Sequence, residues 1–190
     1  MFVRSWMTSP VVAIETSATI LDGLRLMEMR RIRRLPVFSG DFLAGIVTRE
    51  DLHAQLGYGE GANRELEVPL ERAMRSPVKT VSPNDTLERA AELMLEHEVS
   101  GLPAMDGERV VGMITESDVF RAFTRLMGIR EPGARVTMAV PEGGDLVDEI
   151  VKRAGGLSIR SLAASPATGG GWDVVMRVRG RSAVPSASPR

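Results

Sequence analysis

The sequence repeats itself at an interval of 67 residues, and this repeat limits the fold more than any other feature does. Residues 7–51 align with residues 74–118 without a gap, and 13 of the 45 aligned pairs are identical. A repeat of this length indicates one supersecondary unit that is built twice. The identical pairs include Met7/Met74, Ser9/Ser76, Pro10/Pro77, Leu35/Leu102, Pro36/Pro103, Gly45/Gly112, Thr48/Thr115 and Asp51/Asp118.

Each copy carries the same pattern, which predicts an extended segment, an amphipathic helix, two strands and a second helix. A proline near the start of the second strand requires the first helix to end before it, because proline is not tolerated inside a helix. In the first copy the elements are 11–14, a helix with Ile20, Leu24 and Met27, 35–38, 43–47, and a helix after Thr48. In the second copy they are 78–81, a helix with Leu87, Ala91 and Met94, 102–105, 110–114, and a helix after Thr115.

Polar pairs three residues apart mark the start of the first helix in each copy. Thr19 with Asp22, and Asp85 with Glu88, have the spacing of an N-terminal capping box. We therefore expect each helix to begin directly after the first residue of its pair.

The pattern changes after residue 127. Alternating apolar residues at 136–140 predict a strand, an apolar stripe over 146–154 predicts a helix that ends at Gly155, and strands are predicted at 157–162 and 172–178. The order of this last part is β-α-β-β.

The predicted fold class is α/β (α+β), with two β-α-β-β-α repeats in a pseudo-twofold pair and a small β-α-β-β appendage. Two such repeats can bury their sheets and helices against each other, whereas one alone is small for independent stability. The predicted limits are 1–60 for the first repeat, 61–67 for a linker, 68–127 for the second repeat, 134–180 for the appendage and 181–190 for a disordered tail.

Composition narrows the classes of function. The formal net charge of -1 does not favour a nucleic-acid binder, and the absence of cysteine with only two histidines predicts no metal site. The sequence has no Gly-x-Ser-x-Gly elbow and no phosphate-binding loop, so no enzyme is predicted. It also lacks an apolar run of about 20 residues, the length that is needed to span a bilayer. The first residues do not have the pattern expected of a signal peptide. We therefore expect a cytoplasmic protein without a membrane partner.

Both repeats end in the pattern Gly-x-x-Thr-x-x-Asp, at 45–51 and 112–118. Two interpretations of this pattern remain open. In the first, Thr48 with Asp51 and Thr115 with Asp118 form capping boxes at the start of a helix. In the second, the helix N-terminus receives a phosphate and the aspartate accepts the hydroxyl groups of a ribose.

The repeat resembles a tandem pair of CBS domains, also called a Bateman module. The resemblance covers residues 1–127 and is carried by the Leu-Pro strands at 35–37 and 102–104, by 99–103, and by the two Gly-x-x-Thr-x-x-Asp ends. The last part is similar to an ACT domain at 141–146 and 155–159, but Gly143 stands where that family usually has proline, and the second helix and last strand are missing. The order of the parts resembles that of bacterial acetoin-utilisation regulatory proteins.

The resemblance implies that each Gly-x-x-Thr-x-x-Asp end binds an adenosine nucleotide, with the backbone before the Leu-Pro strand framing the adenine. The second end is expected to form the better pocket, because Thr80 stands where the first repeat has Ala13, and small residues stand where it has arginines. The candidate ligand-binding residues are Thr80, Val99, Ser100, Gly101, Leu102, Pro103, Thr115 and Asp118 in the second repeat, and Ile32, Arg33, Arg34, Pro36, Thr48 and Asp51 in the first.

The densest basic cluster of the chain is formed by Arg30, Arg31, Arg33 and Arg34. These side chains can form a solvated face with salt bridges to glutamates, neutralise a phosphate at the predicted cleft, or contact a nucleic acid. The sequence leaves these three interpretations open.

The function predicted from these features is a regulatory module that binds adenosine-containing nucleotides in clefts between its repeats. AMP, ADP, ATP and S-adenosylmethionine are the candidate regulatory ligands, and a regulated enzyme or transporter is the expected partner. A homodimer is predicted, because the unfinished β-α-β-β sheet leaves surface to cover. The alternative is a structural dimerisation or protein-interaction module that binds no ligand.

Overall fold

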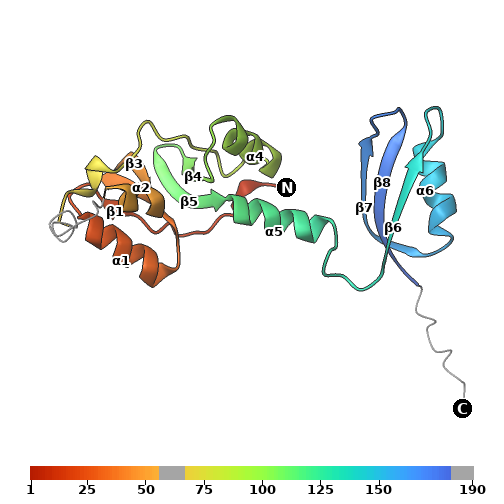
Figure 1. Cartoon of the computed structure of the whole chain (residues 1–190), viewed down its shortest axis with the longest axis horizontal. Coiled ribbons are helices and arrows are strands. Elements are labelled where there is room, and N and C mark those ends of the chain that lie inside the picture. The colour runs from red at the N-terminus through yellow and green to blue at the C-terminus, as the bar shows by residue number, and fades with distance from the viewer. Residues whose placement is uncertain (56–66, 181–190) are drawn as a thin grey trace, which may run out of the picture. The chain divides into compact units, whose positions relative to one another are not determined.

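The computed structural model describes residues 1–55 and 67–180 (Figure 1). The chain divides into two compact units, Met1–Val119 and Phe120–Arg190. Residues 61–66 of the predicted linker and the whole predicted tail, 181–190, lie outside the described residues. No helix among the described residues is both long enough and apolar enough to cross a membrane. The predicted cytoplasmic location is not tested by this observation and stays a prediction.

The first repeat has the predicted order of elements. These are β1 (Ile14–Glu15), α1 (Ile20–Arg30), β2 (Arg34–Ser39), β3 (Phe42–Thr48) and α2 (Arg49–Ala54). The strands form one sheet in the order β1-β2-β3, with β1 parallel and β3 antiparallel to β2. The capping box predicted for α1 is confirmed, because the Thr19 hydroxyl accepts from the Asp22 amide while the Asp22 carboxylate accepts from the Thr19 amide.

The second repeat repeats this order with one difference. Its elements are α4 (Leu87–Glu96), β4 (Gly101–Asp106), β5 (Arg109–Thr115) and α5 (Glu116–Leu126). The predicted extended segment at 78–81 forms no strand ladder and contributes only an isolated parallel bridge between Val81 and Ala104. The sheet of this repeat therefore consists of the antiparallel pair β4-β5.

The capping pair predicted for α4 is wrong. The helix begins one residue later than expected, so that Thr86 is the N-cap and its hydroxyl accepts from the Arg89 amide. The Asp85 carboxylate instead accepts from the Ser82 amide and closes the turn before the helix. Threonine and aspartate are both good capping residues, and the start of the helix decides which of them serves.

The two repeats exchange their leading segments. The leading segments are residues 1–8 of the first repeat and 68–75 of the second. Residues 1–8 pair with the second repeat, through Phe2 with Thr86 and Thr8 with Met113, and residues 68–75 pair with the first, through Pro69 with Thr19 and Arg75 with Ile46. Each bridge in one direction has a counterpart 67 residues away in the other. The exchange is therefore a consequence of the pseudo-twofold relation, and each folded repeat is completed by residues from outside its own sequence copy.

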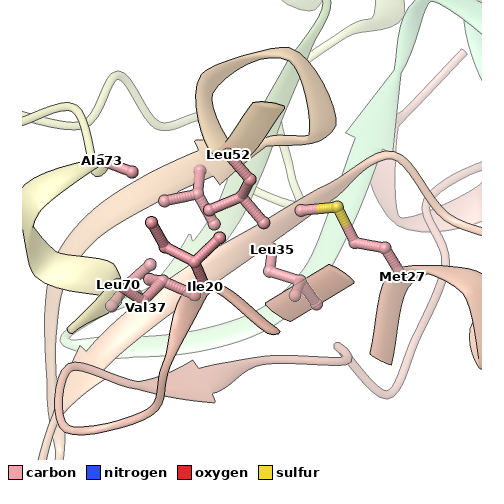
Figure 2. Close-up of a cluster of buried hydrophobic side chains, with 8 residues drawn as sticks. Ile20, Met27, Leu35, Val37, Leu52, Leu70 and Ala73 are labelled. Carbon is pink, nitrogen blue, oxygen red and sulfur yellow. The ribbon is translucent and has the colours of Figure 1, made fainter. Parts of the chain in front are cut away.

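The core of the first repeat shows this exchange in its packing (Figure 2). Leu70, which lies in the short 3-10 helix η2 (Leu70–Arg72), is fully buried among side chains of α1, β2 and α2. Gly23 on α1 permits this contact, because a Cβ there would lie 2.7 Å from the Leu70 Cδ1 atom. The equivalent 3-10 helix η1 (Val3–Ser5) lies in the leading segment of the first repeat and buries Val3. The members of the core cluster are Ile20, Met27, Leu35, Val37, Val47, Leu52, Leu70 and Ala73.

The last part of the chain forms the predicted β-α-β-β arrangement. Its elements are β6 (Ala134–Val140), α6 (Leu146–Ala154), β7 (Ser158–Pro166) and β8 (Trp172–Arg179), and the sheet is antiparallel in the order β6-β8-β7. The Asp145 carboxylate caps α6 by accepting from the Val147 and Asp148 amides, and Gly155 ends the helix with φ 54°. Ile150 packs with apolar residues of β6 and β8 in a small separate core. The likeness of this part to ACT domains stays a prediction.

Candidate functional site

The glycines that open the two Gly-x-x-Thr-x-x-Asp patterns are required by packing. A Cβ on Gly45 would lie 2.6 Å from the Met74 sulfur and 3.1 Å from the Arg75 carbonyl oxygen. A Cβ on Gly112 would lie 2.7 Å from the Met7 sulfur and 2.9 Å from the Thr8 carbonyl oxygen, which is backbone and cannot move aside as a side chain can. Met7 and Met74 belong to the exchanged leading segments. The glycine therefore lets the leading segment of the other repeat cross closely over β3 and β5, and this role needs no ligand.

The Thr and Asp residues of these patterns lie where a strand ends and a helix begins. Thr48 with Asp51 is called the first Thr–Asp motif, at the start of α2, and Thr115 with Asp118 is called the second, at the start of α5. The Asp51 Oδ2 atom accepts from the Thr48 amide at 2.9 Å and from the Thr48 hydroxyl at 2.7 Å, while the Thr48 hydroxyl accepts from the Asp51 amide at 3.1 Å. The capping interpretation is thereby confirmed for the first motif. The binding of a ribose stays a prediction.

The second motif has closely similar geometry. The Asp118 Oδ2 atom accepts from the Thr115 amide at 2.9 Å and from the Thr115 hydroxyl at 2.6 Å. Asp118 is only 2% exposed and lies in the first turn of α5. A carboxylate buried to this degree needs charged or hydrogen-bonding neighbours, because burial of a charge is costly without them.

The first motif carries one contact that the sequence analysis did not foresee. The Arg75 guanidinium donates from Nε at 2.8 Å and from Nη2 at 2.6 Å to the Asp51 Oδ1 atom. Arg75 belongs to the leading segment of the second repeat and is placed by its paired backbone bonds with Ile46. Burial alone would raise the pKa of the Asp51 carboxyl, but the hydrogen bonds from Thr48 and Arg75 outweigh it and hold that pKa below its ordinary value.

A cavity of about 250 Å³ lies where the two repeats meet. The first repeat supplies residues of β2, β3 and α2, and the second repeat supplies its leading segment, the segment after it, and the backbone before β4. Its volume is close to the lower end of the range of about 300–1,000 Å³ that is typical of small-molecule pockets. The lining residues are Arg34, Ile46, Thr48, Glu50, Arg75, Val78, Lys79, Glu98, Val99, Ser100 and Gly101.

Arg34 fixes one wall of this cavity. Its Nη2 atom donates to the Ser100 hydroxyl, so a side chain of the first repeat is bonded to a side chain of the second. Burial lowers the pKa of the Arg34 guanidinium from its ordinary value, and the nearby charge of Arg33 adds to this effect. An arginine nevertheless stays charged at neutral pH. The wall therefore presents a fixed positive charge to the cavity.

The cavity brings together five of the predicted ligand-binding residues, Arg34, Thr48, Val99, Ser100 and Gly101. The other nine do not line it. Leu102, Pro103 and Pro36 are buried in the strands that support it, Arg33 is exposed, and Thr80, Ile32 and Thr115 are half-buried. Asp51 and Asp118 complete the set and are bonded to Thr48 and Thr115 in the two Thr–Asp motifs. The assignment of these residues to a ligand stays a prediction.

Sequence reasoning missed six lining residues, which are Ile46, Glu50, Arg75, Val78, Lys79 and Glu98. Arg75 and Lys79 flank the Ser-Pro turn that opens the second repeat, and nothing in their local sequence places them beside β3. The signal that could have located Arg75 is the register of the repeat, since Met74 matches Met7. That register becomes informative only when the exchange of leading segments is known.

The chain is similar to known proteins in its sequence. The family model described as "CBS domain" matches residues 3–57 and 68–125. A 33.4 kDa protein encoded in a ribosomal RNA operon of Thermofilum pendens is 34% identical over 136 residues, which are 67% of this chain and 45% of that protein. The chain spans less than half the length of the first curated relatives that it matches.

The fold of the chain is also similar to that of solved structures. The AcuB protein of Vibrio cholerae, named for acetoin utilization, has a TM-score of 0.60 and 30% identity, over 69% of this chain and 96% of that one. CBSX2, which was solved in complex with AMP, has a TM-score of 0.56 and 27% identity, over 65% of this chain and 96% of that one.

Proposed function

The chain belongs to the CBS-domain family, and from this premise we propose that its two repeats form a regulatory module that binds an adenosine-containing ligand in the cavity between them. The observation that carries the proposal is the cavity itself, because both repeats line it and the Ser100 hydroxyl of the second repeat is bonded to a fixed cation of the first. The proposed role is non-catalytic.

The shape of the cavity suits the parts of a nucleotide. Backbone groups at Val99, Ser100 and Gly101 line the cavity and are of the kind that recognise the edge of an adenine, and Val78 adds an apolar contact. The Val99 amide and the Ser100 carbonyl are already bonded, to Met94 and Glu116, so the remaining groups are the ones proposed to serve. Gly101 has no side chain to obstruct this approach. The related CBSX2 structure, which holds AMP, supports the choice of adenosine compounds.

The charges of the cavity favour an anionic ligand. Arg34, Arg75 and Lys79 line it, against two carboxylates, Glu50 and Glu98. Charge-assisted hydrogen bonds from arginine to a phosphate are about twice as strong as neutral ones. We therefore propose AMP, ADP or ATP as ligands, with S-adenosylmethionine, whose charge differs, as the contrasting candidate.

Ligand binding would regulate the protein by favouring one arrangement of the two repeats. A ligand shifts a conformational equilibrium only through a difference in affinity for its states. The cavity meets this condition, since its walls come from both repeats and a ligand that contacts both is sensitive to their spacing. The partner that responds is proposed to be an enzyme or a transporter.

The proposal is tested by thermal unfolding with AMP, ADP, ATP and S-adenosylmethionine. A ligand present at 100 times its Kd stabilises the protein that binds it by about 2.7 kcal/mol. We expect such a shift for the wild-type chain and a clearly smaller one for Asp118→Ala. Ser165→Ala, in the C-terminal unit and outside the cavity, is the control and keeps the shift. The absence of a shift with all four compounds at several millimolar would refute the proposal.

A second candidate function, self-association, is favoured by a different observation. Phe120, Phe123 and Leu126 follow one another at intervals of three residues on α5 and are 66%, 53% and 51% exposed. A contiguous exposed apolar patch can mark a protein–protein interaction site. We propose that the chain forms a homodimer, and light scattering at micromolar concentration measures its mass directly. If the module only associates, Asp118→Ala costs a helix cap of about 1 kcal/mol and no ligand shifts the unfolding.

A further inference from the structure

Ser100 is bonded on two sides. Its hydroxyl accepts from the Arg34 Nη2 atom, and its backbone carbonyl accepts from the Glu116 amide at 3.2 Å. Glu116 is the first residue of α5, and Ser100 and Arg34 both line the cavity. One residue therefore joins the cation of the cavity to the start of α5.

The first repeat has only half of this connection. Arg33 occupies the position of Ser100, and its carbonyl accepts from the Arg49 amide at 2.8 Å, so the backbone bond to the helix is present in both repeats. Arg34 occupies the position of Gly101, which has no side chain that could reach Arg33. The pseudo-twofold pair is thus unequal here, because the side-chain bond leads to α5 and has no counterpart at α2.

The charge of Arg34 is shared with the same helix. Burial lowers the pKa of the Arg34 guanidinium, and the charge of Arg33 adds to this effect, whereas the carboxylates of Glu116, Glu50 and Asp118 act in the opposite direction. Two of these three carboxylates, those of Glu116 and Asp118, belong to the first turn of α5. An anionic group that enters the cavity must therefore compete for the guanidinium with its present partners, most of which belong to the second repeat.

We propose that Arg34 couples ligand binding in the cavity to the start of α5. A guanidinium has five N–H donors in a fixed fork, so it can hold a phosphate with two of them. The anionic group of a ligand draws the guanidinium from the Ser100 hydroxyl, and Ser100 then holds the Glu116 amide less firmly. The two compact units divide between Val119 and Phe120, so α5 is the helix that is common to both. The inference rests on the proposed function, because it says how an anionic ligand in that cavity acts on the rest of the protein.

AMP and adenosine are the probes, because they differ only in the phosphate that competes for Arg34. Titration calorimetry measures both affinities in the wild-type chain, in Ser100→Ala and in Arg34→Gln. Removal of the Ser100 hydroxyl should raise the ratio of AMP affinity to adenosine affinity about fivefold, since a hydrogen bond of about 1 kcal/mol no longer opposes the phosphate. Arg34→Gln should lower that ratio by at least as much, because charge-assisted hydrogen bonds are the stronger ones. Ser165→Ala, at an exposed serine of the C-terminal unit, is the matched control and should leave the ratio unchanged.

An unchanged or lower ratio in Ser100→Ala would overturn the inference, because the hydroxyl then does not compete with the phosphate. The AMP affinities of the variants decide alone if adenosine binds too weakly to be measured. The proposed function stands in either case as long as AMP or adenosine binds the wild-type chain. If neither compound binds any variant, the inference and the proposed function both fall.

Hydrogen exchange in the wild-type chain tests the step from Ser100 to α5 without any variant. At equal saturation the Glu116 amide should exchange severalfold faster with AMP than with adenosine, because only AMP takes the guanidinium from Ser100 and loosens the start of the helix. In Ser100→Ala the two ligands should give equal rates, since the side-chain bond is already absent. Equal rates in the wild-type chain, with both ligands bound, would show that binding is not passed to α5 and would leave the proposed function intact.

Discussion

Arg34 lies against Gly101, the residue that occupies its own position in the second repeat. A Cβ on Gly101 would lie 3.0 Å from the Arg34 Cδ atom and 3.1 Å from its Nη1 atom. Residues that are equivalent by a pseudo-twofold operation approach each other only near its axis. A side chain as large as arginine at both positions would collide there, so the divergence of the two copies allows their close contact.

The first prediction concerns this contact. Gly101→Ala should destabilise the protein by about 1–3 kcal/mol, because the added methyl group also meets the Ile114 carbonyl oxygen at 3.1 Å and cannot be accommodated by the side chain of Arg34 alone. Urea unfolding measures the change. Gly169→Ala is the control, since nothing lies within 4 Å of a Cβ at that position. Equal stability of the two variants would show that the repeats are less tightly joined here.

The second prediction concerns the exchange of leading segments. Leu70→Ala should cost about 2–5 kcal/mol, because Leu70 is fully buried in the core of the first repeat although it belongs to the leading segment of the second. Leu95→Ala is the matched control, since that side chain is 81% exposed on α4 and its loss should change stability by at most about 0.5 kcal/mol. A small effect at Leu70 would mean that the two copies fold without the exchange.

The third prediction is a dependence of stability on pH through Asp51. Its folded pKa lies below the ordinary value, so the stabilisation is present above the unfolded pKa of about 3.9 and is lost as the pH falls through the folded pKa. The stability of the wild-type chain should therefore decline below about pH 4 more steeply than that of Asp51→Asn. Urea unfolding at several pH values tests this. Parallel curves would show that Asp51 is not stabilised in its charged form.

The element order was predictable from the sequence because it depends on local spacing. The apolar periods of α1 and α4, the prolines that follow them and the turns before β3 and β5 lie within short windows, and the predicted strands agree with β2 (Arg34–Ser39) and β4 (Gly101–Asp106) within two residues at each end. The capping residue of α4 was predicted wrongly. Thr86 and Asp85 can both cap a helix, and only the position of the first helical turn decides between them.

The exchange of leading segments was not predictable in the same way. Phe2 with Thr86 and Thr8 with Met113 are contacts over long distances in sequence, and no local pattern specifies them. The prediction of the site residues was limited for the same reason. Arg34, Ser100 and Gly101 were named from the repeat and the family resemblance, whereas Arg75 reaches the cavity only through the exchange. The part of the site that was missed is the part that is built by non-local pairing.

The last prediction concerns the ion pair of the first Thr–Asp motif. The Arg75 guanidinium donates twice to the Asp51 Oδ1 atom, although the Arg75 side chain is 71% exposed. Arg75→Gln should therefore lower the free energy of unfolding by at most about 1 kcal/mol, because water screens an exposed ion pair. Urea unfolding at neutral pH measures the change.

Arg72→Gln removes the same charge from the neighbouring 3-10 helix and is the matched control, with no change in stability expected. If Arg75→Gln costs no more than Arg72→Gln, the ion pair does not stabilise the fold. A loss in Arg75→Gln that disappears when the chain also carries Asp51→Asn would show that Arg75 acts through the Asp51 carboxylate, because a double-mutant cycle isolates the interaction between two residues.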